Sequence, residues 1–161
     1  MLVLLFSLGV SAVSFAQSRV TYDLTGSSGT RDGESFTEIH LGLNWFIKEH
    51  INWRNSVFTQ FGNEIKTIYG LDTEALFNWE AYTQSRGLGI ELFAGPGFRF
   101  ASENSNAVFG KAGLTFGIAG LRIGGGVQAF HYWEDRKDKD ENILDKDEVQ
   151  YFVIIAGGGS F

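Results

Sequence analysis

Apolar and polar residues alternate along most of the chain, and this period of two predicts β-strands. No helical period of three and four persists beyond the apolar N-terminal segment. The clearest alternation is in the segment 67–81, where Tyr69, Leu71, Ala75, Phe77 and Trp79 alternate with Gly70, Asp72, Glu74, Asn78 and Glu80. The pattern predicts eight strands, at residues 19–26, 36–46, 51–61, 67–81, 88–100, 107–119, 121–133 and 151–161.

The connections between these strands differ in length and polarity. Short connections are predicted at 47–50, at 82–87 and at Gly120, whereas the stretches 27–35 and 134–148 are longer and charged. Polar loops are also predicted at 62–66 and 101–106. Short turns at one end and longer loops at the other are typical of membrane barrels. Pro96 lacks a backbone donor, so we expect it near a strand end or at a bulge.

Each predicted strand has an apolar row and a polar row. In the third strand Trp53, Val57 and Phe61 would face outward, with Arg54, Ser56 and Gln60 inward; in the sixth, Leu114 would face outward and Thr115 inward. Aromatic residues gather near the strand ends, as amphipathic rings do at a lipid–water boundary. One predicted rim contains Trp45, Phe46, Trp53, Trp79, Tyr82, Tyr151 and Phe161, and the other contains Phe61, Tyr69, Phe100 and Trp133.

The inward rows carry acids and bases on neighbouring strands. The interior of an eight-stranded barrel is just filled by side chains, so charges inside it must pair. We therefore predict a lumen plugged by salt bridges, with no wide pore. Glu91 can pair with Lys111, and Lys111 or Arg122 can pair with an acid across the lumen. The predicted network comprises Glu38, Arg54, Asp72, Glu74, Glu91, Arg99, Lys111 and Arg122.

The last eleven residues form an alternating strand with an aromatic residue at each end of its apolar row. This segment resembles the C-terminal sorting strand of bacterial outer-membrane barrels, whose assembly signal would here be Tyr151, Val153, Ile155 and Phe161. An edge strand of a soluble protein is the alternative.

Taken together, the strands resemble the small eight-stranded outer-membrane barrels of the OmpA/OmpX type. The resemblance implies an all-β, eight-stranded, antiparallel, up-and-down transmembrane β-barrel in the outer membrane of a Gram-negative bacterium, with both termini periplasmic. It also implies a structural or surface-interaction role. The expected partners are outer-membrane lipid and lipopolysaccharide, the barrel-assembly machinery during biogenesis, and an extracellular ligand whose identity the resemblance leaves open.

The N-terminal segment is apolar and ends in Ser14-Phe15-Ala16, a small-x-small cleavage pattern. We therefore expect a signal peptide at 1–16 and a barrel domain at 17–161. The segment lacks the usual basic residues, which suggests a start further upstream, and a short anchor helix is the alternative. The net charge of −6 argues against a nucleic-acid partner, and the absence of cysteine excludes disulfides and thiolate metal sites.

Candidate chemistry is sparse, and we expect no catalytic activity, cofactor or metal. Barrels that deacylate lipid A have a serine two residues after a histidine, whereas Trp133 holds that position after His131. Asp138, Asp140 and Asn142 open a calcium-loop pattern that Ile143 breaks at its sixth position. Two other functions stay open: a lipid A-modifying barrel enzyme, and a secreted lipocalin-like barrel that would carry its apolar rows inside around a small apolar ligand.

Overall fold

The computed structural model describes residues 19–31, 34–62, 66–82, 88–118 and 121–157. The predicted signal peptide at 1–16 and Phe161 lie outside the described residues. The strands are β1 (Arg19–Arg31), β2 (Glu34–Lys48), β3 (Ile51–Gly62), β4 (Ile68–Tyr82), β5 (Leu88–Ala101), β6 (Ala107–Ile118), β7 (Leu121–Tyr132) and β8 (Asp147–Gly157). Within these ranges no helix has the length and apolarity needed to cross a membrane.

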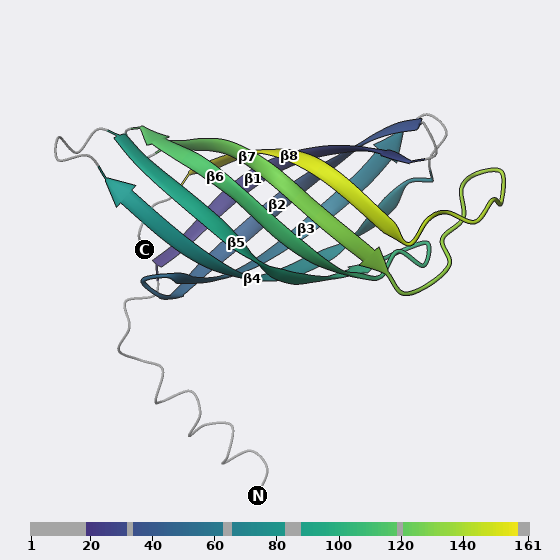
Figure 1. Cartoon of the computed structure of the whole chain (residues 1–161), viewed down its shortest axis with the longest axis horizontal. Coiled ribbons are helices and arrows are strands. Elements are labelled where there is room, and N and C mark those ends of the chain that lie inside the picture. Colours follow the sequence, from purple (N-terminus) through teal and green to yellow (C-terminus); the bar gives the residue numbers. More distant parts are fainter. Residues whose placement is uncertain (1–18, 32–33, 63–65, 83–87, 119–120, 158–161) are drawn as a thin grey trace, which may run out of the picture.

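The eight strands form one closed barrel in sequence order (Figure 1). Every neighbouring pair is antiparallel, and β8 closes the barrel on β1 from Tyr22↔Gly157 to Gly29↔Gln150. β1 begins and β8 ends at one end of the barrel, which we call the turn end. The long 133–146 connection projects from the other end, the loop end. The predicted all-β, antiparallel, up-and-down architecture is confirmed.

Burial alternates along the strands, so each strand has one face in the interior. In β3 Arg54, Ser56 and Gln60 are buried, whereas Trp53 and Val57 are exposed, as predicted. In β6 the outward Leu114 is 38% exposed and the inward Thr115 is 3% exposed. Large apolar side chains cover the outside and charged ones fill the inside. This is the opposite of the arrangement that a lipocalin-like barrel requires.

The predicted loop at 27–35 is wrong, because most of it is strand. β1 continues to Arg31 and β2 begins at Glu34, with pairing that runs to Arg31↔Glu34. Ser27 and Ser28, in this stretch, have hydrogen-bond partners on neighbouring strands. The Ser27 hydroxyl donates to Gln150 at 3.2 Å and the Ser28 hydroxyl donates to the Phe36 carbonyl at 3.0 Å. Polar composition therefore did not indicate a loop here.

The last strand also begins earlier than predicted, at Asp147 rather than Tyr151. Charged residues at 147 and 148 suggested a loop, but both have partners at the loop end. Asp147 pairs with His131 on the outer face, at 2.7 Å, and Glu148 turns inward to Arg136, at 3.1 Å.

Pro96 lies inside β5, not at a strand end or bulge as predicted. Pairing with β4 steps from Glu74↔Gly97 to Phe77↔Ala94 without a register shift. At this point the strands are very close, because a Cβ on Gly95 would lie 1.9 Å from the Ala75 carbonyl oxygen. The proline is therefore accommodated where the hydrogen-bonded pairing between β4 and β5 is interrupted, between Gly97 and Ala94.

Two predicted rim aromatics are placed differently in the structure. Phe46 is 9% exposed and belongs to the interior. Tyr151 faces outward but pairs with Ser28 and Val127, well away from the turn end. Trp45 and Trp53 do lie together near the turn end, with ring centroids 6.4 Å apart. The period of two assigns a face reliably, but it does not give the height of a residue along the barrel.

Candidate functional site

The interior of the barrel contains all eight residues of the predicted network. Seven are between 0% and 7% exposed, and the Arg122 side chain is 17% exposed. The structure arranges them in three clusters, centred on Arg54, Arg99 and Glu91. The predicted assembly-signal residues that the structure describes, Tyr151, Val153 and Ile155, are exposed on the outer face of β8.

The first cluster surrounds Arg54 of β3. Its guanidinium donates to both carboxylate oxygens of Asp23 on β1, at 2.8 and 2.7 Å. It also donates to Glu74 on β4, at 2.5 Å, and to the Ser56 hydroxyl, at 3.0 Å. Lys111 of β6 reaches the same Glu74 carboxylate at 3.3 Å. Two basic and two acidic side chains, one from each of four strands, thus neutralise one another. Their pairing offsets the free-energy cost of burying the four charges.

The second cluster surrounds Arg99 of β5, nearer the loop end. Its guanidinium donates two bonds to Glu38, each 2.9 Å, and two to Asp72, at 2.9 and 2.8 Å. Such bidentate pairs are the strong form of charge-assisted hydrogen bond. The rings of Phe58 and Phe130 lie 3.9 and 4.2 Å from the guanidinium carbon. Arg99 therefore fills the lumen between two aromatic faces.

Further polar side chains complete the second cluster. His40 lies 3.0 Å from the Glu38 carboxylate and stacks on Phe58. The Gln150 amide donates to Glu38 at 3.0 Å and accepts a bond from Gln128 at 2.8 Å. These bonds satisfy the carboxylate on the side away from Arg99.

The third cluster lies near the turn end and corrects the predicted Glu91–Lys111 pair. Glu91 accepts bonds from Arg122 at 2.5 Å, from Thr115 at 3.2 Å and from Asn78. Lys111 pairs with Glu74 instead. Lys111 lies opposite Gly95, and Glu91 lies opposite Thr115, four residues along each strand from that pair. Strand adjacency alone therefore selected the wrong partner.

Little free space remains between these clusters. The cavity bounded by Asp23, Lys111 and Arg122 has a volume of about 30 Å³. A water molecule needs roughly 10–15 Å³ measured in this way, so the cavity has room for about two or three waters. Apolar side chains fill the remainder of the lumen in two groups, Leu76, Phe93, Phe152 and Ile154, and Ala107, Phe109, Phe130 and Tyr132. Sequence reasoning did not assign these inward aromatics a role.

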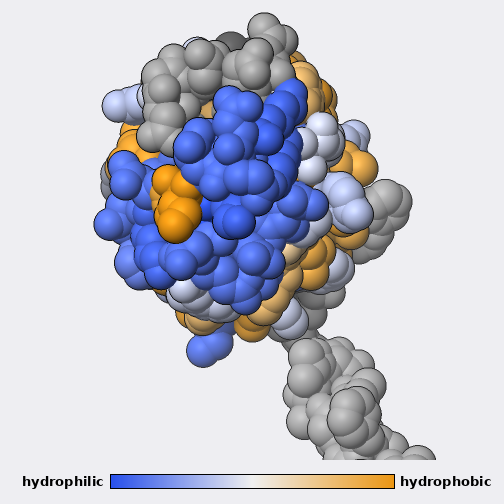
Figure 2. All heavy atoms as spheres, turned by 90° about the vertical axis from the view of Figure 1, so that its right-hand side faces the viewer, coloured by the Kyte–Doolittle hydropathy of each residue, from blue (hydrophilic) through white to orange (hydrophobic). Residues whose placement is uncertain are grey.

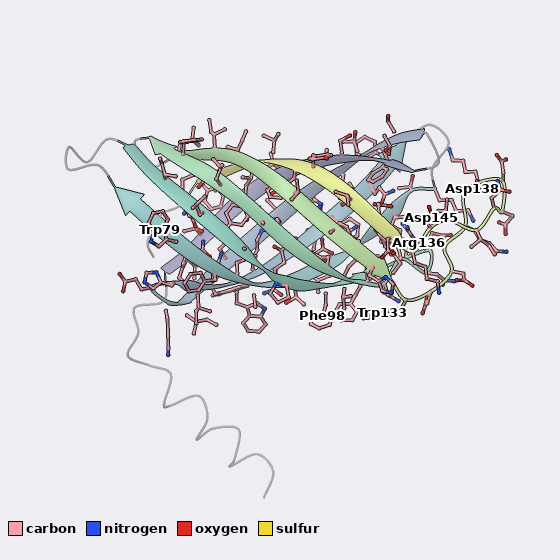
Figure 3. All side chains as sticks on the ribbon, in the orientation of Figure 1. Trp79, Phe98, Trp133, Arg136, Asp138 and Asp145 are labelled. Carbon is pink, nitrogen blue, oxygen red and sulfur yellow. The ribbon has the colours of Figure 1, made fainter. Side chains whose placement is uncertain are left out.

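A residue that the sequence analysis missed closes the loop end. Arg136 comes from the 133–146 connection but is only 2% exposed. Its guanidinium carbon lies 3.3 Å from the centroid of the Tyr132 ring, and it donates to Glu148 at 3.1 Å and to the Asp145 carbonyl at 2.6 Å. Figure 3 shows Arg136 close to the barrel mouth, with Asp138 farther out on the loop. A loop residue has no periodicity that could have indicated its burial.

Beyond Arg136 the connection forms a small hairpin. Lys137 and Ile143 form an antiparallel bridge, and the Asp138 carboxylate accepts bonds from the Asn142 backbone N–H and side-chain amide, both at 2.8 Å. The broken calcium-loop pattern therefore builds a turn. No cluster of three or more potential metal-ligating side chains occurs in the described ranges. In Figure 2 the coloured part of the loop end is mostly hydrophilic, with a small hydrophobic patch among the polar side chains.

The remaining candidate chemistry lies on the outer face near the loop end. His131 Nδ1 is 2.7 Å from the Asp147 carboxylate, and both side chains are exposed. Trp133, which replaces the serine of the deacylase pattern, is 47% exposed. The structure thus shows an acid–histidine pair and no hydroxyl at the position where that pattern places its nucleophile.

These features define a closed eight-stranded antiparallel barrel with an ionic lumen, the fold of the small outer-membrane barrels. Neisserial surface protein A (NspA) has this fold, with a TM-score of 0.60 and 8% identity over 89% of this chain and 98% of that one. A second similar structure is Ail, the attachment invasion locus protein of Yersinia pestis, in complex with the heparin analogue sucrose octasulfate. Its TM-score is 0.43, with 12% identity over 88% of this chain and 96% of that one. No family model and no curated protein matches the chain.

A double-mutant cycle should identify the partner of Lys111. Lys111→Met and Glu74→Gln should show a coupling of roughly 0.5–3 kcal/mol in the free energy of unfolding, because Glu74→Gln removes the carboxylate that the buried Lys111 contacts, whereas Lys111→Met leaves Glu74 paired with Arg54 alone. Lys111→Met combined with Glu91→Gln should couple more weakly. Urea titration of the refolded protein measures both cycles. Stronger coupling to Glu91 than to Glu74 would contradict the assignment.

The hairpin in the 133–146 connection should depend on pH. The bonds from Asn142 lower the pKa of Asp138, and Lys137 lowers the pKa of Glu141. A carboxyl group whose pKa is lowered by folding stabilises the folded form above its ordinary pKa, here 3.8 and 4.5, and loses that contribution as the pH falls through the lowered value. The hairpin should therefore be ordered at neutral pH and loosen only in acid.

The Asn142 amide resonance reports this change in an NMR titration. It should shift as Asp138 is protonated, and Asp138→Asn should abolish the shift, whereas the matched change Asp145→Asn should preserve it. An Asn142 resonance that titrates normally in Asp138→Asn would refute the assignment.

Proposed function

We propose that this chain is an outer-membrane barrel with a structural or surface-interaction role, whose lumen is sealed by its ionic network. The observation that carries the proposal is that charged side chains lie inside the barrel and apolar side chains outside, the reverse of a soluble protein. Arg54 and Arg99 are buried at 1% exposure, whereas apolar side chains such as Leu41 and Val57 are exposed at 59% and 56%. A soluble protein rarely exposes so continuous an apolar surface, but lipid requires one.

The lengths of the connections support a periplasmic turn end and an external loop end. At the turn end β2 and β3 are joined directly through residues 49–50, whereas the 133–146 connection lies at the other end. Outer-membrane barrels have short periplasmic turns and longer outer loops. In this orientation both chain termini lie in the periplasm. We also propose that residues 1–16 direct export and are removed, so that 17–161 form the barrel domain.

The packing of the lumen supports a scaffold in preference to a channel. The Arg99 cluster and the apolar group that includes Phe130 and Tyr132 pack together below the Arg136 cap at the loop end, and the cavity nearer the turn end has room for about two or three waters. The exposed His131–Asp147 pair lacks the hydroxyl that the deacylase pattern requires, so we propose no catalytic role for it. The ordered outer hairpin is then the part of the chain that meets the environment.

The proposed partners follow from this placement. Outer-membrane lipid contacts the apolar wall, and lipopolysaccharide contacts the loop-end rim near Phe98 and Trp133, which Figure 3 shows close together at that end. The outward residues Tyr151, Val153 and Ile155 of β8 are 67%, 60% and 46% exposed. Together with Phe161 they are available to the barrel-assembly machinery before the barrel closes.

The lipid-facing assignment predicts a position-dependent cost of charge. Leu41 lies midway along β2, so Leu41→Arg should lower the free energy of folding into lipid vesicles by roughly 2–4 kcal/mol, whereas Leu41→Phe should be nearly neutral. Thr30→Arg is the matched control, because Thr30 is outward on β1 next to the loop end, where an arginine costs about 0–1 kcal/mol.

Vesicle refolding followed by the shift of unboiled protein on a gel measures all three variants. Leu41→Arg that folds as well as the parent would contradict the membrane assignment.

A further inference from the structure

The outward wall of the barrel is not uniform, because one open hollow of about 440 Å³ interrupts it. Its floor lies on β5, β6 and β7 and consists of small residues, among them Ala94, Ala112 and Gly125. Phe77 and Trp79 of β4 form one side, at 59% and 53% exposure. Apolar side chains and glycine backbone line the whole hollow, so a ligand that occupies it must be apolar.

Closely packed backbone makes the floor rigid. A Cβ on Gly124 would lie 2.0 Å from the Leu114 carbonyl oxygen, and one on Gly126 would lie 2.1 Å from the Ala112 carbonyl oxygen. Glycine is therefore required where β7 approaches β6. A floor built from paired backbone keeps its shape without a ligand, which lowers the cost of ordering on binding.

The size of the hollow favours a chain-like ligand over a second copy of the protein. Eleven residues line it, whereas a stable interface uses about 20–30 residues on each side. The hollow extends across β4 to β7, three strand spacings or about 14 Å. An acyl chain fits such a groove and gains contacts on its floor and sides that it lacks on a flat wall.

The position of the hollow indicates which lipid fits. Leu92 and Gly125 lie nearer to the turn-end limits of β5 and β7 than to the loop-end limits. The β2–β3 turn adjoins the hollow, since the His50 ring lies 5.8 Å from the Phe77 ring. This exposed turn carries Lys48 and His50 beside Glu49. A cationic side chain at this level suits the phosphate of a lipid in the turn-end leaflet.

We propose that the hollow on β4–β7 is a binding site for one acyl chain of a phospholipid in the turn-end leaflet. The inference rests on the proposed membrane placement, which makes this leaflet the inner, phospholipid one. It adds a defined site to the general contact between the wall and lipid.

Filling the hollow tests the proposal. The parent, Ala112→Phe and the matched control Ala129→Phe are refolded in phosphatidylethanolamine–phosphatidylglycerol vesicles, transferred to detergent and examined by native mass spectrometry. Ala129 also faces outward on β7 but lies outside the hollow. The parent and Ala129→Phe should retain one phospholipid per barrel, and occupancy in Ala112→Phe should fall roughly tenfold or more, because the new ring occupies the chain's place.

The gel shift of unboiled protein, recorded on the same samples, distinguishes loss of the acyl-chain site from failure of the barrel to insert. Barrels that insert but retain no phospholipid, or retain it equally in all three proteins, would overturn the acyl-chain site and leave the membrane placement intact. A parent dimer that Ala112→Phe abolishes would make a second copy the occupant and would also overturn it. Failure of the parent to insert would overturn both.

Discussion

Two buried arginines link the wall of the barrel across its interior, because each guanidinium pairs with one carboxylate on a neighbouring strand and one farther round. Arg99 on β5 binds Asp72 on β4 and Glu38 on β2. Arg54 on β3 binds Glu74 on β4 and Asp23 on β1. Removing one partner of such a pair typically costs 3–5 kcal/mol, because a buried charge is left uncompensated. The pairs therefore specify strand register as well as filling the lumen.

This constraint accounts for the two surfaces of the molecule. With polar side chains committed to the interior, alternation leaves the outside apolar, which suits lipid. The cavity bounded by Asp23, Lys111 and Arg122 is correspondingly small, at about 30 Å³. A buried arginine also holds the 133–146 connection at the loop end. Arg136 pairs with Glu148 and contacts the Tyr132 ring, and these contacts keep the hairpin over the barrel mouth. The described residues thus form a hairpin at the loop end and an apolar wall around the barrel.

Much of the fold could be predicted from the sequence, because the period of two determines which face each residue occupies. It placed Arg54 and Thr115 inside and Leu114 outside without a structure. The same reasoning failed for features that the alternation of residues does not encode, namely loop bounds, ion-pair partners and the burial of loop residues. Polar composition at 27–35 suggested a loop, although Ser27 and Ser28 find partners in the barrel. The partners of Glu91 depend on barrel shear, which no single strand reveals. The burial of Arg136 depends on the path of a loop.

The claim that the charged interior seals the barrel is tested most directly by ionic conductance. The purified protein, refolded and inserted into a planar lipid bilayer, should produce no sustained single-channel steps at neutral pH in concentrated potassium chloride. Insertion is verified in the same preparation by the shift of unboiled protein on a gel. Silence from inserted barrels is the result that a filled lumen predicts. Reproducible, long-lived open-channel steps would show that the network leaves a continuous water path, and would contradict the account.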